Sequence, residues 1–216
     1  MVVCIIIPVF NREKLVARAI RSALDQKDII NSNYEIIVIN DGSEDNSENE
    51  ILKFKEHITY IKNRKNLGLP ASRNKGIIAA KGRYIFNLDS DDYIHPKTLS
   101  VFLTAFELIP DASCIASNYV YTDVNDNKSN PISFKKKPIA CSIMFKRQLL
   151  LDIGLYDEHF KVHEEKDLWF RIKEKKFKII YLNLPLYRYF KHDDSLSNSD
   201  KSDHFINLLK NKYDDI

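Results

Sequence analysis

Residues 35–43 read Glu-Ile-Ile-Val-Ile-Asn-Asp-Gly-Ser, a short β-branched run that ends abruptly in a polar turn. The same arrangement occurs at residues 3–11, Val-Cys-Ile-Ile-Ile-Pro-Val-Phe-Asn, and at residues 84–92, Tyr-Ile-Phe-Asn-Leu-Asp-Ser-Asp-Asp. Continuously apolar runs of this length are typical of strands that are buried on both faces of a parallel sheet. They predict an α/β fold in which polar turns follow the carboxyl ends of the strands.

Helices are expected between these strands, because apolar residues recur there at helical spacing. The first is expected after an N-cap at Asn11, the second around Ile51, the third over residues 70–80 and the fourth after Pro96. Alternation of strands and helices indicates βαβ units and a mainly parallel central sheet. The strands are expected at residues 3–8, 35–39, 59–61 and 84–88.

The second part of the chain has a different pattern. Residues 118–138 are polar and rich in Asn, Asp and Lys, and they predict a loop. Beyond them we expect helices at residues 147–153 and 164–175, and strands at residues 178–182 and 186–190. The last segment predicts an amphipathic helix with Phe205, Leu208 and Leu209 on one face. We therefore divide the chain into residues 1–110, residues 111–200 and a terminal helix over residues 201–216.

Composition limits the class of protein. A chain of 216 residues with 44% hydrophobic residues can form one real core, and its 33 basic and 30 acidic residues nearly balance. The basic run at residues 135–137 lacks a recognised nucleic-acid motif, so we expect a solvated face and no nucleic-acid partner. Three distant cysteines without a Cys-x-x-Cys pair exclude a zinc ribbon and favour a reducing compartment. Residues 2–9 are expected to be a buried strand of a cytoplasmic protein.

Polar residues gather where the early strands are expected to end. In open α/β sheets, ligands bind beyond the carboxyl ends of the strands, which here are residues 8–12, 40–43 and 89–92. The sequence contains neither Gly-x-Gly-x-x-Gly nor Gly-Lys-Ser or Gly-Lys-Thr, so a dinucleotide fingerprint and a P-loop are both absent. A bound phosphate must therefore be held in another way.

Three carboxylates within residues 89–92 favour a hard divalent cation that bridges a diphosphate. The alternative is a solvated turn that is rich in Asp, because this residue is common in turns. Asp41 similarly suits either a turn or a contact to a base or ribose. Residues 66–76 enter a helix whose N-terminus suits an anion or is simply capped. Glu165 lies at the rim of a buried stripe and suits either a general base or a first helical turn.

Five blocks in order carry a resemblance: Ile-Ile-Ile-Pro-Val-Phe-Asn, Val-Ile-Asn-Asp-Gly-Ser, Asn-Leu-Gly-Leu-Pro-Ala-Ser-Arg-Asn-Lys-Gly, Leu-Asp-Ser-Asp-Asp and Glu-Glu-Lys-Asp-Leu-Trp-Phe-Arg. With them the chain strongly resembles the family 2 glycosyltransferases of GT-A fold, from about residue 3 to residue 197. The resemblance implies a Rossmann-like sheet flanked by helices. It also implies a donor half in residues 1–110 and an acceptor and catalytic half in residues 111–200.

The resemblance implies roles for individual residues. Those of the donor site would be Pro8, Phe10, Asn11 and Asp41 around the nucleotide, Asp89 on ribose or base, Gly68, Arg73 and Asn74 shaping the pocket, and Arg188 on the diphosphate. Asp91 of the Asp-x-Asp motif and His192 would contact a Mn²⁺ or Mg²⁺ ion. Glu165 would be the catalytic base, where the family usually has Asp.

The implied reaction is inverting transfer of a sugar from a nucleoside diphosphate sugar, with UDP favoured, to a hydroxyl of a carbohydrate or lipid-linked glycan. Such enzymes build surface polysaccharide, so contact with the inner face of the membrane is a further expectation. A nucleotidyltransferase would need a Gly-rich basic first loop, and residues 8–12 are not one. A non-catalytic sugar or nucleotide binding module of the same fold remains an alternative, and the oligomeric state is left open.

Overall fold

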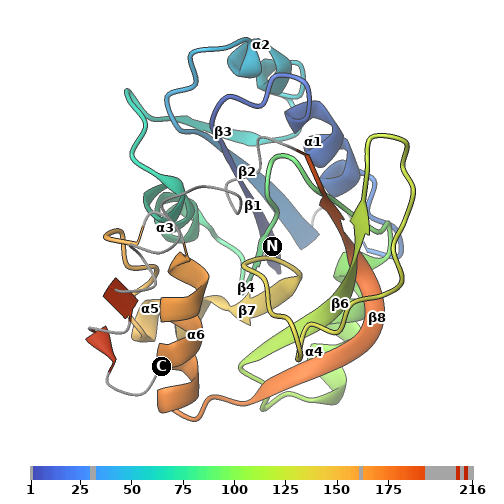
Figure 1. The fold of residues 1–216 in the computed structure, drawn as a ribbon, viewed down its shortest axis with the longest axis vertical. Coiled ribbons are helices and arrows are strands. Elements are labelled where there is room, and N and C mark those ends of the chain that lie inside the picture. Colours follow the sequence, from blue (N-terminus) through green and yellow to red (C-terminus); the bar gives the residue numbers. More distant parts are fainter. Residues whose placement is uncertain (1, 30–32, 161–162, 193–207, 210–211, 214–216) are drawn as a thin grey trace.

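The computed structural model describes residues 2–29, 33–160, 163–192, 208–209 and 212–213. Within them the chain forms an α/β fold with a curled central sheet that is flanked by helices (Figure 1). The sheet has the order β3-β2-β1-β4-β7-β6-β8-β5. Its strands are β1 Val3–Val9, β2 Tyr34–Asn40, β3 Thr59–Lys62, β4 Tyr84–Asn87, β5 Tyr93–Ile94, β6 Cys114–Thr122, β7 Ile143–Lys146 and β8 Ile179–Phe190.

The first four strands confirm the predicted parallel unit. β1 pairs in parallel with β2 and β4, and β2 pairs in parallel with β3. The carboxyl ends of β1, β2 and β4 therefore emerge at one edge of the sheet. The three polar turns at residues 10–12, 41–43 and 89–92 follow these ends and are brought together there, as the sequence predicts.

The helices lie where the periodicity predicts them, with one correction at the first. They are α1 Val16–Leu24, α2 Ser47–Leu52, α3 Leu69–Ala79, α4 Thr98–Leu108, α5 Arg147–Asp152 and α6 Glu164–Glu174. Asn11 does not cap α1, because its backbone has a φ of 51° and the carbonyl of Arg12 accepts the amides of Leu15 and Val16. A turn thus separates Asn11 from the helix.

The predicted loop over residues 118–138 is partly wrong, because β6 extends to Thr122. Its polar residues are buried but hydrogen-bonded: the Asn118 amide donates to Asn183 at 2.7 Å, and the Ser117 and Ser142 hydroxyls are 2.9 Å apart. The two late strands predicted at 178–182 and 186–190 form one strand, β8, which shifts register against β6 around Asn118. β7 and β8 flank β6, antiparallel and parallel respectively.

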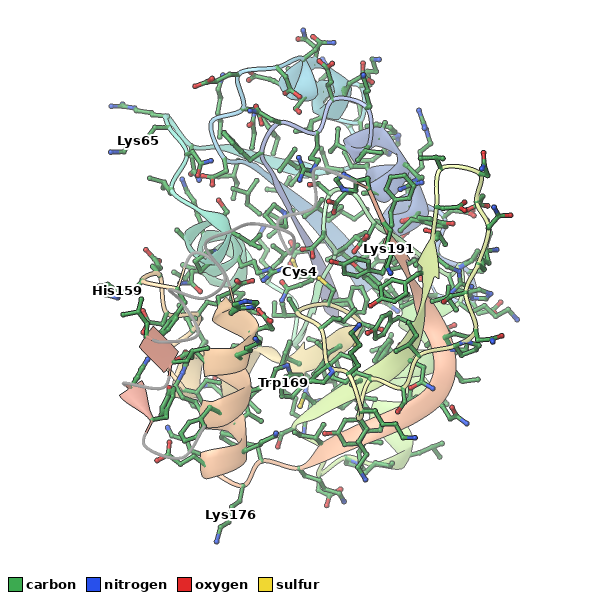
Figure 2. The ribbon with its side chains drawn as sticks, in the orientation of Figure 1. Cys4, Lys65, His159, Trp169, Lys176 and Lys191 are labelled. Atoms are coloured by element: carbon green, nitrogen blue, oxygen red, sulfur yellow. The ribbon has the colours of Figure 1, made fainter. Side chains whose placement is uncertain are left out.

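Helices cover both faces of the sheet. α1 and α4 pack on one face, while α3 and α6 pack on the other, where Trp169 of α6 contacts Phe134 and Phe145 (Figure 2). None of the helices in the described residues has both the length and the apolar composition that crossing a bilayer requires. Of the predicted terminal face, Leu208 and Leu209 pack with Phe160, and Phe205 lies outside the described residues.

Candidate active site

The turn after β4 places three carboxylates in three different environments. Asp92 is buried; its carboxylate accepts the Tyr187 hydroxyl at 2.6 Å and the Phe190 amide at 2.8 Å. Burial, together with the charges of Asp91 and Asp89, raises the pKa of Asp92 well above its ordinary value. Asp92 therefore fixes the turn to β8, a role that the sequence analysis missed because Tyr187 lies 95 positions away.

Asp91 is brought together with His192, the other predicted metal contact. Oδ2 of Asp91 lies 2.9 Å from Nε2 of His192 and 3.5 Å from Nε of Arg12. The backbone carbonyl of Asp91 accepts a hydrogen bond from Arg18 at 2.7 Å, which orients the residue from α1. The Asp91 side chain is 19% exposed, so a ligand at the edge of the sheet can reach it.

A carboxylate oxygen beside an imidazole nitrogen is a donor pair that fits Mn²⁺ better than Mg²⁺, which prefers oxygen ligands alone. Within the described ranges, no cluster of three or more His, Cys, Asp or Glu side chains is placed to hold a metal ion. Phosphate and water could supply further ligands to a cation bound between Asp91 and His192. This is the coordination expected when the substrate itself carries a diphosphate.

Arg73 connects the turn to the start of α6. Its guanidinium is fully buried and forms ion pairs with Asp89, at 2.7 Å, and with Glu164. Its Nη2 also lies 3.8 Å from Sγ of Cys141. Because an unpaired buried charge is costly, this arrangement ties α3, the Asp-rich turn and α6 into one unit. Arg73 was predicted in the site, whereas its partner Glu164 was not.

The two adjacent glutamates of α6 differ in exposure. Glu164 is buried, and burial raises its pKa to about 7 although Arg73 acts in the opposite direction. The Glu165 side chain is 19% exposed, and its Oε1 lies 3.7 Å from Nδ1 of His163. His163 precedes the helix in a left-handed conformation, with a φ of 64°. Glu164 is thus held inside, while Glu165 remains at the rim, as its place beside the buried Trp169 stripe predicts.

Asp41 shapes a neighbouring loop. Its Oδ1 accepts the Asn63 side-chain amide at 2.7 Å and the Leu67 backbone amide at 2.9 Å, while its Oδ2 accepts the Gly68 amide at 2.9 Å. Gly68 has a φ of 99°, a conformation that favours glycine, and it directly precedes α3. In this arrangement Asp41 and Gly68 form the wall of the site between β2 and α3.

The turn after β1 lies beside the turn after β2. Pro8 is buried in β1, and Phe10 is 38% exposed directly beyond the strand. The Asn11 amide donates to the Ser43 hydroxyl at 3.1 Å, and the Asn11 side chain accepts the Glu44 amide at 2.9 Å. The first two turns are therefore locked together. The Phe10 ring stays exposed beyond these turns, and its contact with a base stays a prediction.

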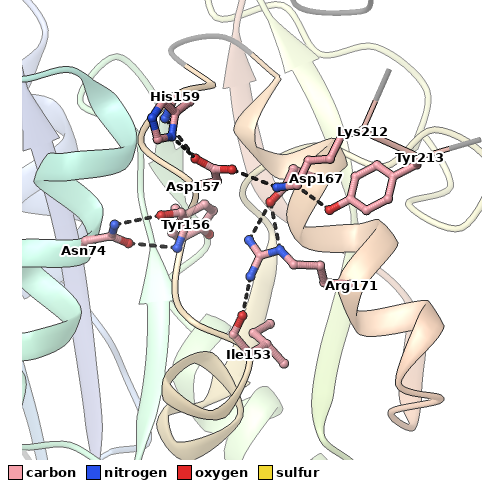
Figure 3. Close-up of polar contacts among 9 residues, drawn as sticks. All are labelled: Asn74, Ile153, Tyr156, Asp157, His159, Asp167, Arg171, Lys212 and Tyr213. Carbon is pink, nitrogen blue, oxygen red and sulfur yellow. Dashed lines mark hydrogen bonds and ion pairs between the residues drawn. The ribbon is translucent and has the colours of Figure 1, made fainter. Parts of the chain in front are cut away.

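Two predicted site residues are engaged elsewhere. Asn74 exchanges two hydrogen bonds of 2.9 Å with the backbone of Tyr156, and so links α3 to the segment before α6 (Figure 3). Arg188 donates to the carbonyls of Pro185, at 2.5 Å, and Tyr187, at 3.5 Å. Within the described residues, these hydrogen bonds hold Arg188 on the backbone of β8 and not on the carboxylates of the turn after β4. Its contact with a diphosphate stays a prediction.

Comparison with known proteins supports the resemblance seen in the sequence. A family model described as Glycosyl transferase family 2 matches residues 4–180. The chain is 30% identical over 187 residues to the putative colanic acid biosynthesis glycosyl transferase WcaA of Escherichia coli, covering 79% of this chain and 65% of that protein. The chain spans only 58–65% of the length of WcaA and of two uncharacterized glycosyltransferases from Rickettsia that are 31% identical to it.

Solved structures show the same fold. TarS 1–349 of S. aureus in complex with UDP-GlcNAc matches with a TM-score of 0.82 at 20% identity, over 98% of this chain and 66% of that one. The mannosyltransferase PcManGT from Pyrobaculum calidifontis, in complex with GDP-Man and Mn²⁺, matches with a TM-score of 0.72 at 16% identity, over 89% and 58%. The predicted GT-A fold is thereby confirmed.

Proposed function

Because the chain belongs to glycosyl transferase family 2, we propose that it transfers a sugar from a nucleoside diphosphate sugar to an acceptor hydroxyl with inversion at the anomeric carbon. A UDP-sugar is the favoured donor, in line with the nucleotide held by the TarS structure. The acceptor would be a carbohydrate or a lipid-linked glycan of a surface polysaccharide, reached from the cytoplasm at the inner face of the membrane. The relative WcaA is named for colanic acid biosynthesis, which supports a polysaccharide acceptor.

One observation carries the proposal: Arg73 joins the donor-side Asp89 to Glu164, the residue before the predicted base. The carboxylates at the end of β4 and the glutamates at the start of α6 belong to segments that are 72 or more positions apart. Inverting transfer needs a leaving-group site and a base on opposite sides of one reacting carbon. The Arg73 bridge brings these two parts of the chain together, which supports the proposal of a single site.

Glu165 would remove the proton from the acceptor hydroxyl. It lies at the rim, where an acceptor can approach, whereas Glu164 is buried against Arg73. A positioned general base contributes about 10²–10⁴-fold to a rate. Near His163 the carboxylate has a polar neighbour that can orient it, which supports the assignment of the base to Glu165.

Asp91 and His192 would hold a divalent cation, with Mn²⁺ favoured by the imidazole. When bound, the cation would offset the charge that develops on the departing nucleoside diphosphate. Phe10 and the wall formed by Asp41 and Gly68 would hold the nucleoside. Asp89, fixed by Arg73 at 2.7 Å, keeps one carboxylate oxygen to accept a ribose hydroxyl.

Thermal unfolding with UDP, GDP, CDP, ADP and dTDP, each with and without Mn²⁺, tests the donor class. A ligand present at about 100 times its dissociation constant stabilises the folded state by about 2.7 kcal/mol. We expect UDP with Mn²⁺ to raise the melting temperature more than UDP alone. In the variant Asp91→Asn, UDP should keep its metal-independent effect and lose the part that depends on Mn²⁺.

Two results would contradict this proposal. If no nucleoside diphosphate stabilises the protein at millimolar concentration, the alternative of a non-catalytic module with another ligand gains support. If Asp91→Asn keeps the full metal-dependent stabilisation, the cation is bound elsewhere. Asp111→Asn is the matched control, because Asp111 is exposed, pairs with Lys178 and lies outside the site.

A further inference from the structure

Three tyrosines form a compact cluster on β6 and β8 beside the Asp-rich turn. The rings of Tyr121 and Tyr189 meet edge to face with centroids 5.4 Å apart, and Tyr119 meets Tyr121 at 5.7 Å. The strand register sets Tyr119 opposite Tyr187 and Tyr121 opposite Tyr189. Neighbours that are directly opposite lie on the same face of a sheet, so the cluster continues the row that begins with Tyr187.

Two lysines place their charges on this cluster. Nζ of Lys191 lies 3.8 Å from the centroid of the Tyr121 ring, and Nζ of Lys137 lies 5.4 Å from it. Within the described ranges, neither lysine forms an ion pair with a carboxylate. An aromatic ring attracts a cation without neutralising its charge, so two positive charges are concentrated at one side chain.

The hydroxyl of Tyr121 responds to these charges. Burial alone would raise its pKa, but a hydrogen bond from Lys137 and the charges of Lys137 and Lys191 lower the pKa below its ordinary value. The neighbouring Tyr119 has a raised pKa, because burial and Tyr121 act in the same direction there. The two lysines therefore make the surroundings of Tyr121 more positive than the near-balanced net charge of +3 suggests.

The cluster adjoins the proposed catalytic centre. Tyr187, in the same row of rings, donates its hydroxyl to Asp92 at 2.6 Å. His192, the residue after Lys191, lies 2.9 Å from Asp91. Figure 2 shows Lys191 near the middle of the molecule, and Lys176 far from it at the end of α6. Residues 135–137 are predicted from sequence to be a solvated basic run, because the aromatic partner of Lys137, Tyr121, lies on another element, β6.

We propose that Tyr121, Lys137 and Lys191 form an acceptor subsite that binds a phosphate group of the acceptor glycan. This inference rests on the proposed function and adds the chemical class of the acceptor. Two ammonium groups and a phenol hydroxyl match the several acceptor oxygens and the charge of a phosphate. Both lysines are exposed, so a phosphate group can reach their ammonium groups from solvent. The donor diphosphate is assigned to Asp91 and His192, next to the Lys191 end of the cluster, so UDP binding must be measured beside binding of the acceptor phosphate.

Saturation-transfer difference NMR on the whole 216-residue chain with UDP and diamagnetic Mg²⁺ present tests the subsite. The probes are a glycerol phosphodiester trimer, N-acetylglucosamine joined by a diphosphate to a farnesyl chain, and neutral N-acetylglucosamine. We expect a phosphorylated probe to bind at least about tenfold more tightly than the neutral sugar. The tighter of the two phosphorylated probes tells whether the phosphate belongs to a polymer or to a lipid diphosphate.

The double variant Lys137→Ala/Lys191→Ala should weaken the phosphorylated probe by about tenfold or more and leave UDP binding unchanged. Tyr121→Phe, which keeps the ring and removes the hydroxyl, should weaken it by about threefold. The matched control is Lys173→Ala/Lys176→Ala, which removes two exposed charges from the far end of α6 and should change neither ligand.

The inference is overturned if no phosphorylated probe binds more tightly than neutral sugar. It is equally overturned if the Lys137→Ala/Lys191→Ala variant keeps the wild-type affinity, or if this variant loses UDP, since the lysines would then serve the donor. Failure of the proposed function has a separate readout. If UDP does not bind to the wild-type chain, the donor assignment fails, while titration with the phosphorylated probes still measures the subsite.

Discussion

Adjacent glutamates at the start of α6 provide a matched pair for the first prediction. Glu165→Gln should lower sugar transfer by about 10²–10⁴-fold and leave UDP affinity unchanged, because it removes the proton acceptor and keeps the shape. Glu164→Gln should lower transfer by less than about tenfold, because a glutamine oxygen still accepts a hydrogen bond from Arg73. Transfer is measured as UDP release on addition of acceptor, and UDP affinity as the shift in melting temperature.

The opposite ranking of these variants would assign the base to Glu164. That outcome has a physical basis to be tested, since burial raises the pKa of Glu164 to about 7, within the range useful for proton transfer. Exposure argues for Glu165, because the Glu164 side chain is only 4% exposed and its Oε1 already accepts from Arg73. Equal activity of both variants and the wild type would remove the base from α6 altogether.

At the residue scale, the sequence predicts which carboxylates lie near the site but not which of them are buried. Asp89, Asp91 and Glu165 could be selected because they follow a strand or flank a buried stripe at fixed spacing. Burial of Asp92 and Glu164 could not, because it depends on Tyr187 and Arg73, which approach them only in the folded chain. The same reason applies to Asn74. Its position in a sequence motif predicts a donor-site residue, but in the folded chain its side-chain amide is hydrogen-bonded to the Tyr156 backbone.

At the scale of elements, α3 and α6 are joined through the buried pair of Arg73 and Glu164. Removal of one partner leaves an uncompensated buried charge, so Arg73→Met should destabilise the protein by about 3–5 kcal/mol. The double variant Arg73→Met/Glu164→Met should be less destabilised than the sum of the two single variants, because neither charge is then left alone. Urea unfolding of the four proteins measures the coupling.

Additive effects in this cycle would show that the pair contributes nothing specific to the joint between α3 and α6. Asp89 accounts for part of the loss in Arg73→Met, since it also pairs with the guanidinium at 2.7 Å. The free energy of unfolding of Asp89→Asn alone measures how much of this loss comes from the pair between Arg73 and Asp89. Its side chain is 26% exposed, so its unpaired form can be hydrated and a smaller effect is expected.

Elements were predictable where one physical signal dominates. The strands β1, β2 and β4 are mostly apolar because helices cover both faces of the sheet. These apolar runs are visible in the sequence and predict the strands. No strand was predicted at β6, and its residues 118–122 were assigned to a loop, because the polar side chains of Asn118 and Thr122 form their hydrogen bonds inside the sheet. Pro185 and Asn183 suggested a break, although β8 passes through them with a shift of register that the sequence does not reveal.

At the scale of the whole molecule, the distant residues Lys212 and Tyr213 hold α6 from outside. The Asp167 Oδ1 accepts Lys212 at 2.7 Å and the Tyr213 hydroxyl at 2.6 Å, while Arg171 binds the other oxygen (Figure 3). Lys212 also pairs with Asp157 at 2.8 Å. α6 carries Glu164 and the proposed base Glu165, so this contact between distant parts of the chain supports the position of both glutamates.

Lys212→Ala should therefore destabilise the protein at neutral pH by about 1–2 kcal/mol, reduced by the partial exposure of the lysine.

Burial opposes the ionised form of Asp157, but hydrogen bonds from Lys212 and His159 lower its pKa to about 2. A carboxyl group with a lowered folded pKa stabilises the fold above its unfolded pKa of about 4, and this contribution is lost as the pH falls from about 4 to 2. Urea unfolding at pH 7, 4 and 2.5 should show a smaller acid-induced loss in Lys212→Ala than in wild type, with Lys173→Ala unchanged. An identical acid-induced loss in all three proteins would contradict the contact between Lys212 and Asp157.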